Sequence, residues 1–146
     1  QQLVAESLGK SSKGVLPIIS DMPKDNHSLM QLYLDGNKNC FFTFFDVIDA
    51  NSPKIKNKIL DNFKYLKGHS LQSIKLAQKQ ATQIVFKAKK IPFRSFEILK
   101  KNEETLGELF TFFMLETILL GKMMKINPFD QPAVELIKKE TKRILV

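Results

Sequence analysis

The sequence predicts an α/β fold in which short buried strands alternate with amphipathic helices. Apolar runs rich in β-branched or aromatic residues occur at 15–20 and 40–48, and both have the length of strands. Apolar residues recur at helical spacing elsewhere, most clearly over 70–89. Strands separated by helices of this length form parallel sheets with helices on both faces. We therefore expect a three-layer α/β/α sandwich around a parallel sheet.

Three segments are expected to be strands. Residues 15–20, VLPIIS, predict a buried strand, although Pro17 lacks the N–H that a ladder needs. Residues 40–48, CFFTFFDVI, form a near-continuous aromatic run that is typical of a strand covered on both faces. Residues 94–99, RSFEIL, alternate apolar and polar side chains.

The other periodic segments predict helices. Gly36 ends a helix over 28–34, and Ile91-Pro92 ends the helix over 70–89. The segment 105–124 is apolar almost throughout and predicts a buried core helix, because its most apolar stretch is short for a membrane span of about 20 residues. A shorter helix is expected around Ile55, Ile59, Leu60 and Phe63.

The last helix follows a corner dense in helix-stopping and turn residues. The stretch 126–138, INPFDQPAVELIK, stops the preceding helix, turns the chain and starts a basic amphipathic helix over 128–146. Its side toward the core is expected to carry Val134, Leu136, Ile137, Thr141, Ile144 and Leu145.

Composition indicates one soluble domain over residues 1–146, with 43% hydrophobic and 26% charged residues. The single Cys40 excludes an internal disulfide and fits a reducing compartment, and the N-terminal segment has no secretory pattern. We expect a cytoplasmic protein with no membrane partner. The formal charge of +8 fits solvated lysine-rich helix faces, a small anionic substrate or a nucleic acid. The scattered lysines lack the basic-aromatic array of RNA binders, so a nucleic-acid partner is not expected.

Few residue patterns support a specific chemistry. Two histidines and one cysteine show no metal-ligand spacing, and no glycine-rich phosphate loop or acyl-transfer nucleophile motif occurs, so no cofactor or metal is expected. Glu6, His27 and Lys138 remain, each in or near a turn at a helix end. A carboxylate, an imidazole and an ammonium together can move protons on a polar substrate, although each alone is more often a surface residue.

Five segments resemble the C-terminal part of glucose-6-phosphate isomerase of the bacterial type. They are FMLETILLGKMMKINPFDQPAVELIKK at 113–139, AESLGK at 5–10, KDNHSLMQLYLDG at 24–36, ATQIVFKAKKIPFRSFEI at 81–98 and LGELF at 106–110. The resemblance implies the aldose–ketose isomerisation of glucose 6-phosphate to fructose 6-phosphate, a step of glycolysis and gluconeogenesis. It also implies a C-terminal SIS (sugar isomerase) domain.

The resemblance also implies roles for single residues. Glu6 is the base that moves a proton between C2 and C1 through an enediol, and His27 helps to open the sugar ring. Lys138 assists at the ring oxygen, and Gln131 contacts the sugar. In the family the histidine comes from the neighbouring subunit, so a homodimer is implied.

The sequence departs from the family in two motifs and in length. Ile137 stands where the family usually has glycine, and Asn26 where it usually has glutamine. The serine/threonine loop that binds the substrate phosphate and the arginine that stabilises the enediolate are not among these residues. We therefore expect an incomplete SIS sheet and little activity from the isolated chain. The alternative is a non-catalytic sugar-phosphate binding module that keeps the fold.

Overall fold

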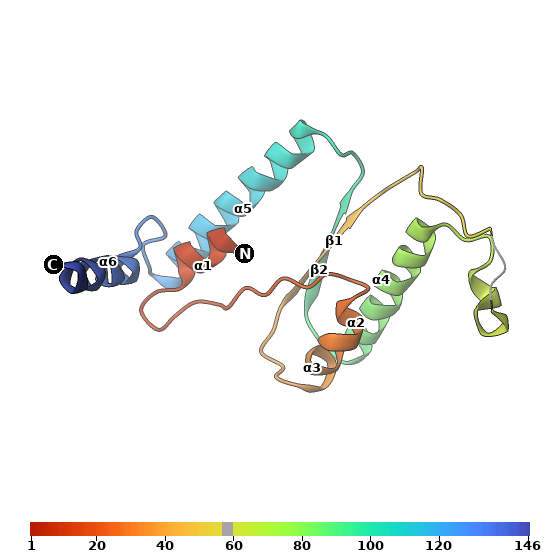
Figure 1. Cartoon of the computed structure of the whole chain (residues 1–146), viewed down its shortest axis with the longest axis horizontal. Helices are drawn as coiled ribbons and strands as arrows, with labels where there is room; N and C mark the ends of the chain where they lie inside the picture. Colours follow the sequence, from red (N-terminus) through yellow and green to blue (C-terminus); the bar gives the residue numbers. More distant parts are fainter. Residues whose placement is uncertain (57–59) are drawn as a thin grey trace. The chain divides into compact units, whose positions relative to one another are not determined.

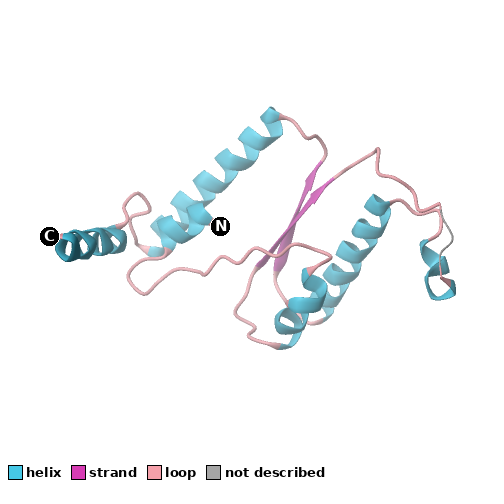
Figure 2. Cartoon of the chain, viewed as in Figure 1, coloured by secondary structure: helices cyan, strands magenta, loops and turns pink. Residues whose placement is uncertain are grey.

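The structure is a computed structural model that describes residues 1–56 and 60–146. The chain divides into two compact units, one made of Gln1–Ile19 with Glu103–Val146 and the other of Ser20–Asn102. The described residues form helices and one two-stranded parallel sheet, which are drawn in Figure 2. The predicted α/β class is therefore confirmed, whereas the third layer and the SIS topology stay predictions.

The second unit is built on two adjacent parallel strands. β1 (Phe42–Val47) pairs with β2 (Phe93–Ile98), with Phe42 opposite Phe93 and Val47 opposite Ile98. The chain between them contains α4 (Leu71–Ala88), so the unit is a βαβ element (Figure 1). The strands predicted over 40–48 and 94–99 are confirmed to within two residues at each end.

Local sequence explains where α4 begins and ends. The Ser70 side chain accepts the backbone N–H of Ser73 at 3.0 Å, which caps the first turn. Lys90 has a φ of +57° and is followed by Ile91-Pro92, so the backbone leaves the helix there. The helix predicted over 70–89 is confirmed.

One aromatic side chain of α4 closes the core of this unit. Phe86 is 1% exposed, and its ring centroid lies 4.8 Å from that of Phe42 and 5.6 Å from that of Phe44, both edge-on. Phe93 completes the cluster at 6.1 Å. Edge-to-face packing of this kind adds to the hydrophobic stabilisation.

An ion-pair group fixes the other part of α4 to the sheet. Asp46 and Glu97 lie opposite each other in register, so their like charges would repel. Lys79 of α4 lies between them, with its Nζ 3.6 Å from Asp46 Oδ2 and 3.4 Å from Glu97 Oε1. Because Asp46 is only 6% exposed, the lysine compensates a carboxylate that has little contact with water.

The segment before β1 forms two short helices in place of the single predicted one. These are α2 (Asp25–Ser28) and α3 (Met30–Asp35), separated at Leu29, whose φ of −120° leaves the helical region. After β1, a 3₁₀ helix η1 covers Asp61–Leu66. The helix expected around Ile55 to Phe63 falls partly on 57–59, which lie outside the described residues.

The first unit consists of α1 (Gln2–Leu8), α5 (Glu103–Met124) and α6 (Pro132–Leu145). α1 packs on α5, where Leu8 is 1% exposed and Thr117 and Gly121 are buried. A Cβ on Gly121 would lie 3.1 Å from the Cβ of Pro128, so glycine lets the following loop fold back tightly on α5.

Several predictions for this unit are wrong. Residues 15–20 form no strand, and Val15, Leu16, Ile18 and Ile19 are exposed. A strand needs a neighbouring strand for its hydrogen bonds, and in the described residues only β1 and β2 form such a ladder. α5 exists as predicted but is not a buried helix, because many of its apolar side chains, Phe110 and Met123 among them, are exposed.

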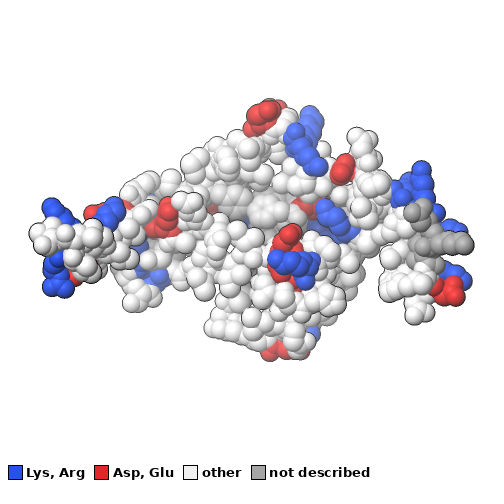
Figure 3. All heavy atoms as spheres, viewed as in Figure 1, with Lys and Arg blue, Asp and Glu red and all other residues white. Residues whose placement is uncertain are grey.

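The C-terminal helix also differs from its prediction. α6 begins at Pro132, which occupies the first turn, and not at 128. Every residue of α6 is exposed, so its predicted packed side covers nothing in the part of the chain that the structure describes. No helix of the described ranges combines the length and apolarity that crossing a bilayer requires. On the face drawn in Figure 3, basic side chains occur next to acidic ones.

Candidate active site

Glu6 lies on the solvent side of α1. Its side chain is exposed, and Oε1 accepts the amide N–H of Gln2, one helical turn earlier, at 2.9 Å. Leu8 of the same helix is buried. The face of α1 that carries Leu8 therefore packs on α5, and another face exposes Glu6.

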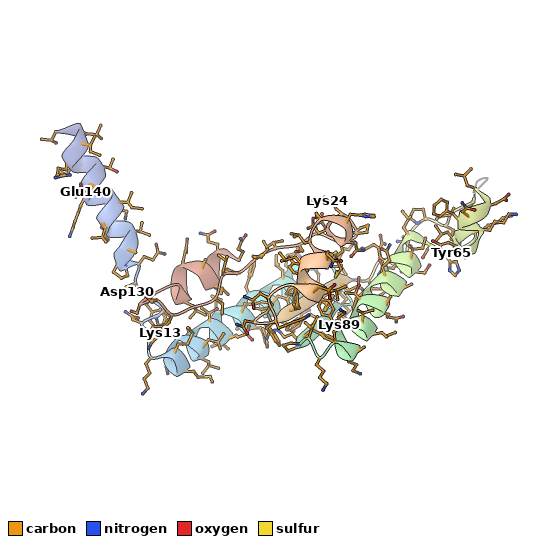
Figure 4. All side chains as sticks on the ribbon, turned by 90° about the horizontal axis from the view of Figure 1, so that it is seen from below. Lys13, Lys24, Tyr65, Lys89, Asp130 and Glu140 are labelled. Carbon is orange, nitrogen blue, oxygen red and sulfur yellow. The ribbon has the colours of Figure 1, made fainter. Side chains whose placement is uncertain are left out.

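Lys10 joins the motif that contains Glu6 to the motif that contains Gln131 and Lys138. Its Nζ donates to the backbone oxygen of Asn127 at 2.5 Å and forms an ion pair with Asp130 Oδ1 at 2.9 Å. Lys13 adds a second link, since its Nζ donates to the Met124 oxygen at 3.1 Å. The segments 5–10 and 126–138 thus meet in space (Figure 4), although more than 110 residues separate these partners in sequence.

The corner between α5 and α6 has a defined local structure. The Asn127 side-chain oxygen accepts the N–H of Phe129 at 3.1 Å, which closes a short Asx turn. The hydrogen bond and charge of Lys10 lower the pKa of Asp130, and the Asn127 side chain contributes to the same effect. Gln131 is exposed at the position before α6, and its side chain makes no capping bond.

Lys138 lies on the exposed surface of α6. Its Nζ is 2.6 Å from Glu135 Oε1, three residues earlier on the same helix. Ile137, the residue that replaces the family's glycine, is exposed as well. The first unit therefore contains Glu6, Gln131 and Lys138, with the ammonium of Lys138 already paired.

His27 belongs to the second unit and is exposed on α2. The turn that carries it is organised by Asp25, which is 7% exposed. Asp25 accepts the backbone N–H of Asp21 at 2.6 Å and the Ser28 hydroxyl at 2.9 Å, and these two bonds lower its pKa. Asp25 therefore lies in the first turn of α2 and fixes the shape of the turn that carries His27.

Two grooves are visible in the second unit. The first has a volume of about 290 Å³ and lies between α3 and α4, with Asn26 at its border. The second lies along α4 and β2, and none of the four candidate residues lines either groove. Within the described ranges, no cluster of three or more His, Cys, Asp or Glu side chains has the geometry to hold a metal ion.

The curated relatives that match this chain share one name. The chain is 39% identical over 152 residues to glucose-6-phosphate isomerase of Mycoplasmopsis pulmonis, covering 99% of the chain and 35% of that protein. It is 37% identical over 141 residues to a probable glucose-6-phosphate isomerase of Methanococcus maripaludis, covering 94% of the chain and 31% of that protein. The chain resembles a segment of glucose-6-phosphate isomerase. The resemblance seen in the sequence motifs is thus confirmed over the whole chain.

The match includes nearly all of this chain but only part of each relative. The glucose-6-phosphate isomerase of Streptococcus mutans is matched at 36% identity over 95% of this chain and 32% of that protein. The chain therefore spans about a third of the length of these glucose-6-phosphate isomerases.

A solved structure has the same fold over nearly all of this chain. The crystal structure of a hypothetical protein from Thermus thermophilus superposes with a TM-score of 0.90 at 27% identity, covering 99% of this chain and 37% of that one. No family model matches the chain.

Sequence reasoning did not assign Lys10, Asp130 or Asp25 to the site. Lys10 lies in the glucose-6-phosphate isomerase motif AESLGK and Asp130 in NPFDQP, so membership of the quoted motifs was a signal for both. Their pairing joins residues 120 positions apart and required the structure.

Proposed function

We propose that this chain supplies part of the active site of a glucose-6-phosphate isomerase, which interconverts glucose 6-phosphate and fructose 6-phosphate. The observation that carries the proposal is 31–39% identity to proteins of that name over more than nine-tenths of the chain. The proposed enzyme is cytoplasmic, acts in glycolysis and needs no cofactor.

Glu6 is the proposed base. A hydrogen on the carbon next to a carbonyl is weakly acidic, so its transfer needs a positioned base and stabilisation of the enediolate. In the proposed reaction Glu6 takes the proton from C2 while the electron pair forms the C1=C2 bond and O1 gains a proton. It then returns a proton to C1 as O2 loses its own and becomes the carbonyl. The exposed position of Glu6 on an anchored helix is compatible with this role.

The other three residues act around the sugar. His27 assists ring opening, Lys138 acts at the ring oxygen and the neighbouring hydroxyl, and Gln131 binds the sugar. Glu135 lies 2.6 Å from the Lys138 ammonium and engages one of its three donors, so the other donors can bind the substrate. Exposed i,i+3 pairs are weak, so a change of partner also costs little.

The direct test is hydrogen exchange at the sugar carbons. A chimera in which this chain replaces the matching third of the Mycoplasmopsis pulmonis enzyme is expected to isomerise fructose 6-phosphate and to incorporate solvent deuterium at C1 and C2, measured by NMR. The isolated 146-residue chain is expected to exchange far more slowly, because the groups that bind the phosphate and stabilise the enediolate are not expected among its residues. Together these groups contribute several kcal/mol, on the order of 10³-fold or more in rate.

Two other outcomes would redirect the proposal. An inactive chimera together with tight binding of fructose 6-phosphate by the isolated chain would favour the non-catalytic binding module. Turnover by the isolated chain at the rate of the intact Mycoplasmopsis enzyme would show that the chain needs no further segment.

We also propose a homodimer in which His27 serves the site of the partner subunit. Chimeras carrying Glu6→Gln and His27→Ala are each expected to be nearly inactive, but mixed dimers contain one site with both residues intact. After subunit exchange at equal concentrations half of the dimers are mixed, so about a quarter of the parental activity should return. A mixture no more active than its two parts would show that both residues act within one chain.

A further inference from the structure

The Lys10 side chain is unusually enclosed for a lysine in a surface loop. It is 9% exposed, whereas the ion-paired lysines Lys64 and Lys138 are 71% and 65% exposed. Holding a long side chain in one conformation costs rotamer entropy, so most surface ion pairs are loose. The low exposure of the Lys10 side chain therefore indicates that its contacts with the surrounding residues hold it in one conformation.

Both acceptors of Lys10 belong to the corner between α5 and α6. They are the Asn127 backbone oxygen at 2.5 Å and the Asp130 carboxylate at 2.9 Å, a neutral and a charged partner. Asn127 also holds the corner in shape through its bond to the Phe129 N–H. Lys10 thus ties the end of α1 to a loop with a defined conformation, and the ammonium has at least two of its three donors engaged.

Each end of this ion pair adjoins a proposed site residue. Glu6 precedes Lys10 by four residues, at the end of α1, and Gln131 follows Asp130 directly. We propose that the Lys10–Asp130 ion pair is a positioning latch that holds Gln131 in place relative to the helix that carries Glu6. The inference rests on the proposed function for its substrate. Lys10 and Asp130 are positioning residues in it and do not react with the sugar.

Removing the charge of Lys10 should release the corner between α5 and α6 from its fixed position relative to α1. Lys10→Met keeps the unbranched side chain apart from its last atom, the ammonium nitrogen, and leaves the Asp130 carboxylate and the Asn127 oxygen without their donor. The corner can then move relative to α1, and small displacements of binding groups have large effects on ligand affinity and rate. The latch should hold above the lowered pKa of Asp130 and open as the pH falls through it, because protonation removes the charge that Lys10 pairs with.

The test uses the isotope-labelled 146-residue chain for the signals and the chimera with the Mycoplasmopsis pulmonis enzyme for the affinity, with fructose 6-phosphate as the probe. NMR of the chain without ligand follows the backbone amides of Glu6 and Gln131 and the Gln131 side-chain amide, and a titration of the chimera gives the affinity. We expect Lys10→Met to shift all three signals, to weaken binding about tenfold, and to raise the lowered pKa of Asp130 toward its ordinary range. Asp130→Asn, a milder change, should shift the same signals and weaken binding to a smaller extent.

The double variant K10D/D130K restores a pair of opposite charges, and it should recover part of the affinity and of the signal positions. The matched control is Lys64→Met, which also removes one ion-paired lysine but belongs to η1 of the other unit. Its signals and affinity should equal those of the unchanged chain.

The outcomes separate the latch from the proposed function. If Lys10→Met and Lys64→Met leave the Gln131 signals and the affinity equally unchanged, the latch is overturned while sugar-phosphate binding stands. If Lys10→Met and Asp130→Asn move the Glu6 and Gln131 signals but no chimera, the one with the unchanged chain included, binds fructose 6-phosphate, the latch is supported and the substrate assignment is removed. Loss of all tertiary signals in Asp130→Asn would show a general stabilising role and would overturn the latch.

Discussion

Replacing Glu6 with glutamine should lower kcat of the chimeric isomerase by about 10²- to 10⁴-fold, the usual contribution of a general base. Glutamine keeps the size of the side chain and its capacity to interact with Gln2, but it cannot take the proton from C1 of fructose 6-phosphate or from C2 of glucose 6-phosphate. Because the change affects the proton-transfer step, KM for fructose 6-phosphate should change far less than kcat. A coupled spectrophotometric assay gives both constants, and deuterium incorporation at C2 should fall in parallel.

Glu108→Gln is the matched control for this prediction. Glu108 is also an exposed helical glutamate, on α5, and its neutralisation should leave kcat within a factor of about two. Equal kcat values for the Glu6→Gln and Glu108→Gln chimeras would exclude Glu6 as the base. A raised KM with normal kcat would instead assign Glu6 to substrate binding.

Phe86→Ala should destabilise the second unit by about 3–5 kcal/mol, the range for truncating a buried aromatic side chain. Phe86 is 1% exposed and contacts Phe42, Phe44 and Phe93, so its removal leaves a cavity between α4 and both strands. A two-stranded sheet is marginal without a packed helix. Urea denaturation followed by circular dichroism measures the change, and amide exchange should become faster at 42–47 and 93–98.

Ile84→Ala on the same helix is the control. Ile84 is 68% exposed, so its truncation should change the free energy of unfolding by no more than about 0.5 kcal/mol. Phe86→Leu, which leaves a smaller void, provides an intermediate value if the alanine variant does not fold. Similar unfolding midpoints for the alanine variants at 84 and 86 would contradict the proposed core.

The elements that sequence patterns predicted correctly are those whose signals are local. The aromatic run before Ile48, the alternation in RSFEIL and the 3.6-residue period of α4 each describe the surfaces of a single element. Capping by Ser70 and the break at Ile91-Pro92 are also local, so the bounds of α4 came within one residue. Short-range patterns are sufficient where an element's own surface determines its structure.

The predictions that were wrong concern contacts with other elements. VLPIIS has the composition of a buried strand, but hydrogen-bonded pairing to a neighbour makes a strand, and composition carries no information on that neighbour. The apolar sequences of α5 and α6 likewise indicate surfaces able to pack, and the side chains of α6 are exposed throughout. A pattern predicts an apolar face without stating what covers it.

For the candidate site too, the sequence predicted which residues to select but not the contacts that they make. Residue identity and motif order were sufficient to select Glu6, His27, Gln131 and Lys138 and to suggest the enzyme that the chain resembles, a resemblance that the comparisons with known proteins confirm. Their roles stay predictions, because reactivity depends on distances to a substrate.

By itself the sequence determined the α/β class, two of the three expected strands, the long helices and the resemblance to a part of glucose-6-phosphate isomerase. Only the tertiary structure decided that Lys10 reaches Asp130, that Lys79 lies between Asp46 and Glu97, and that Asp25 organises the turn of His27. The first two contacts join residues that are distant along the chain. Helical and strand periods describe neighbours in sequence, whereas such ion pairs form only after the backbone has folded.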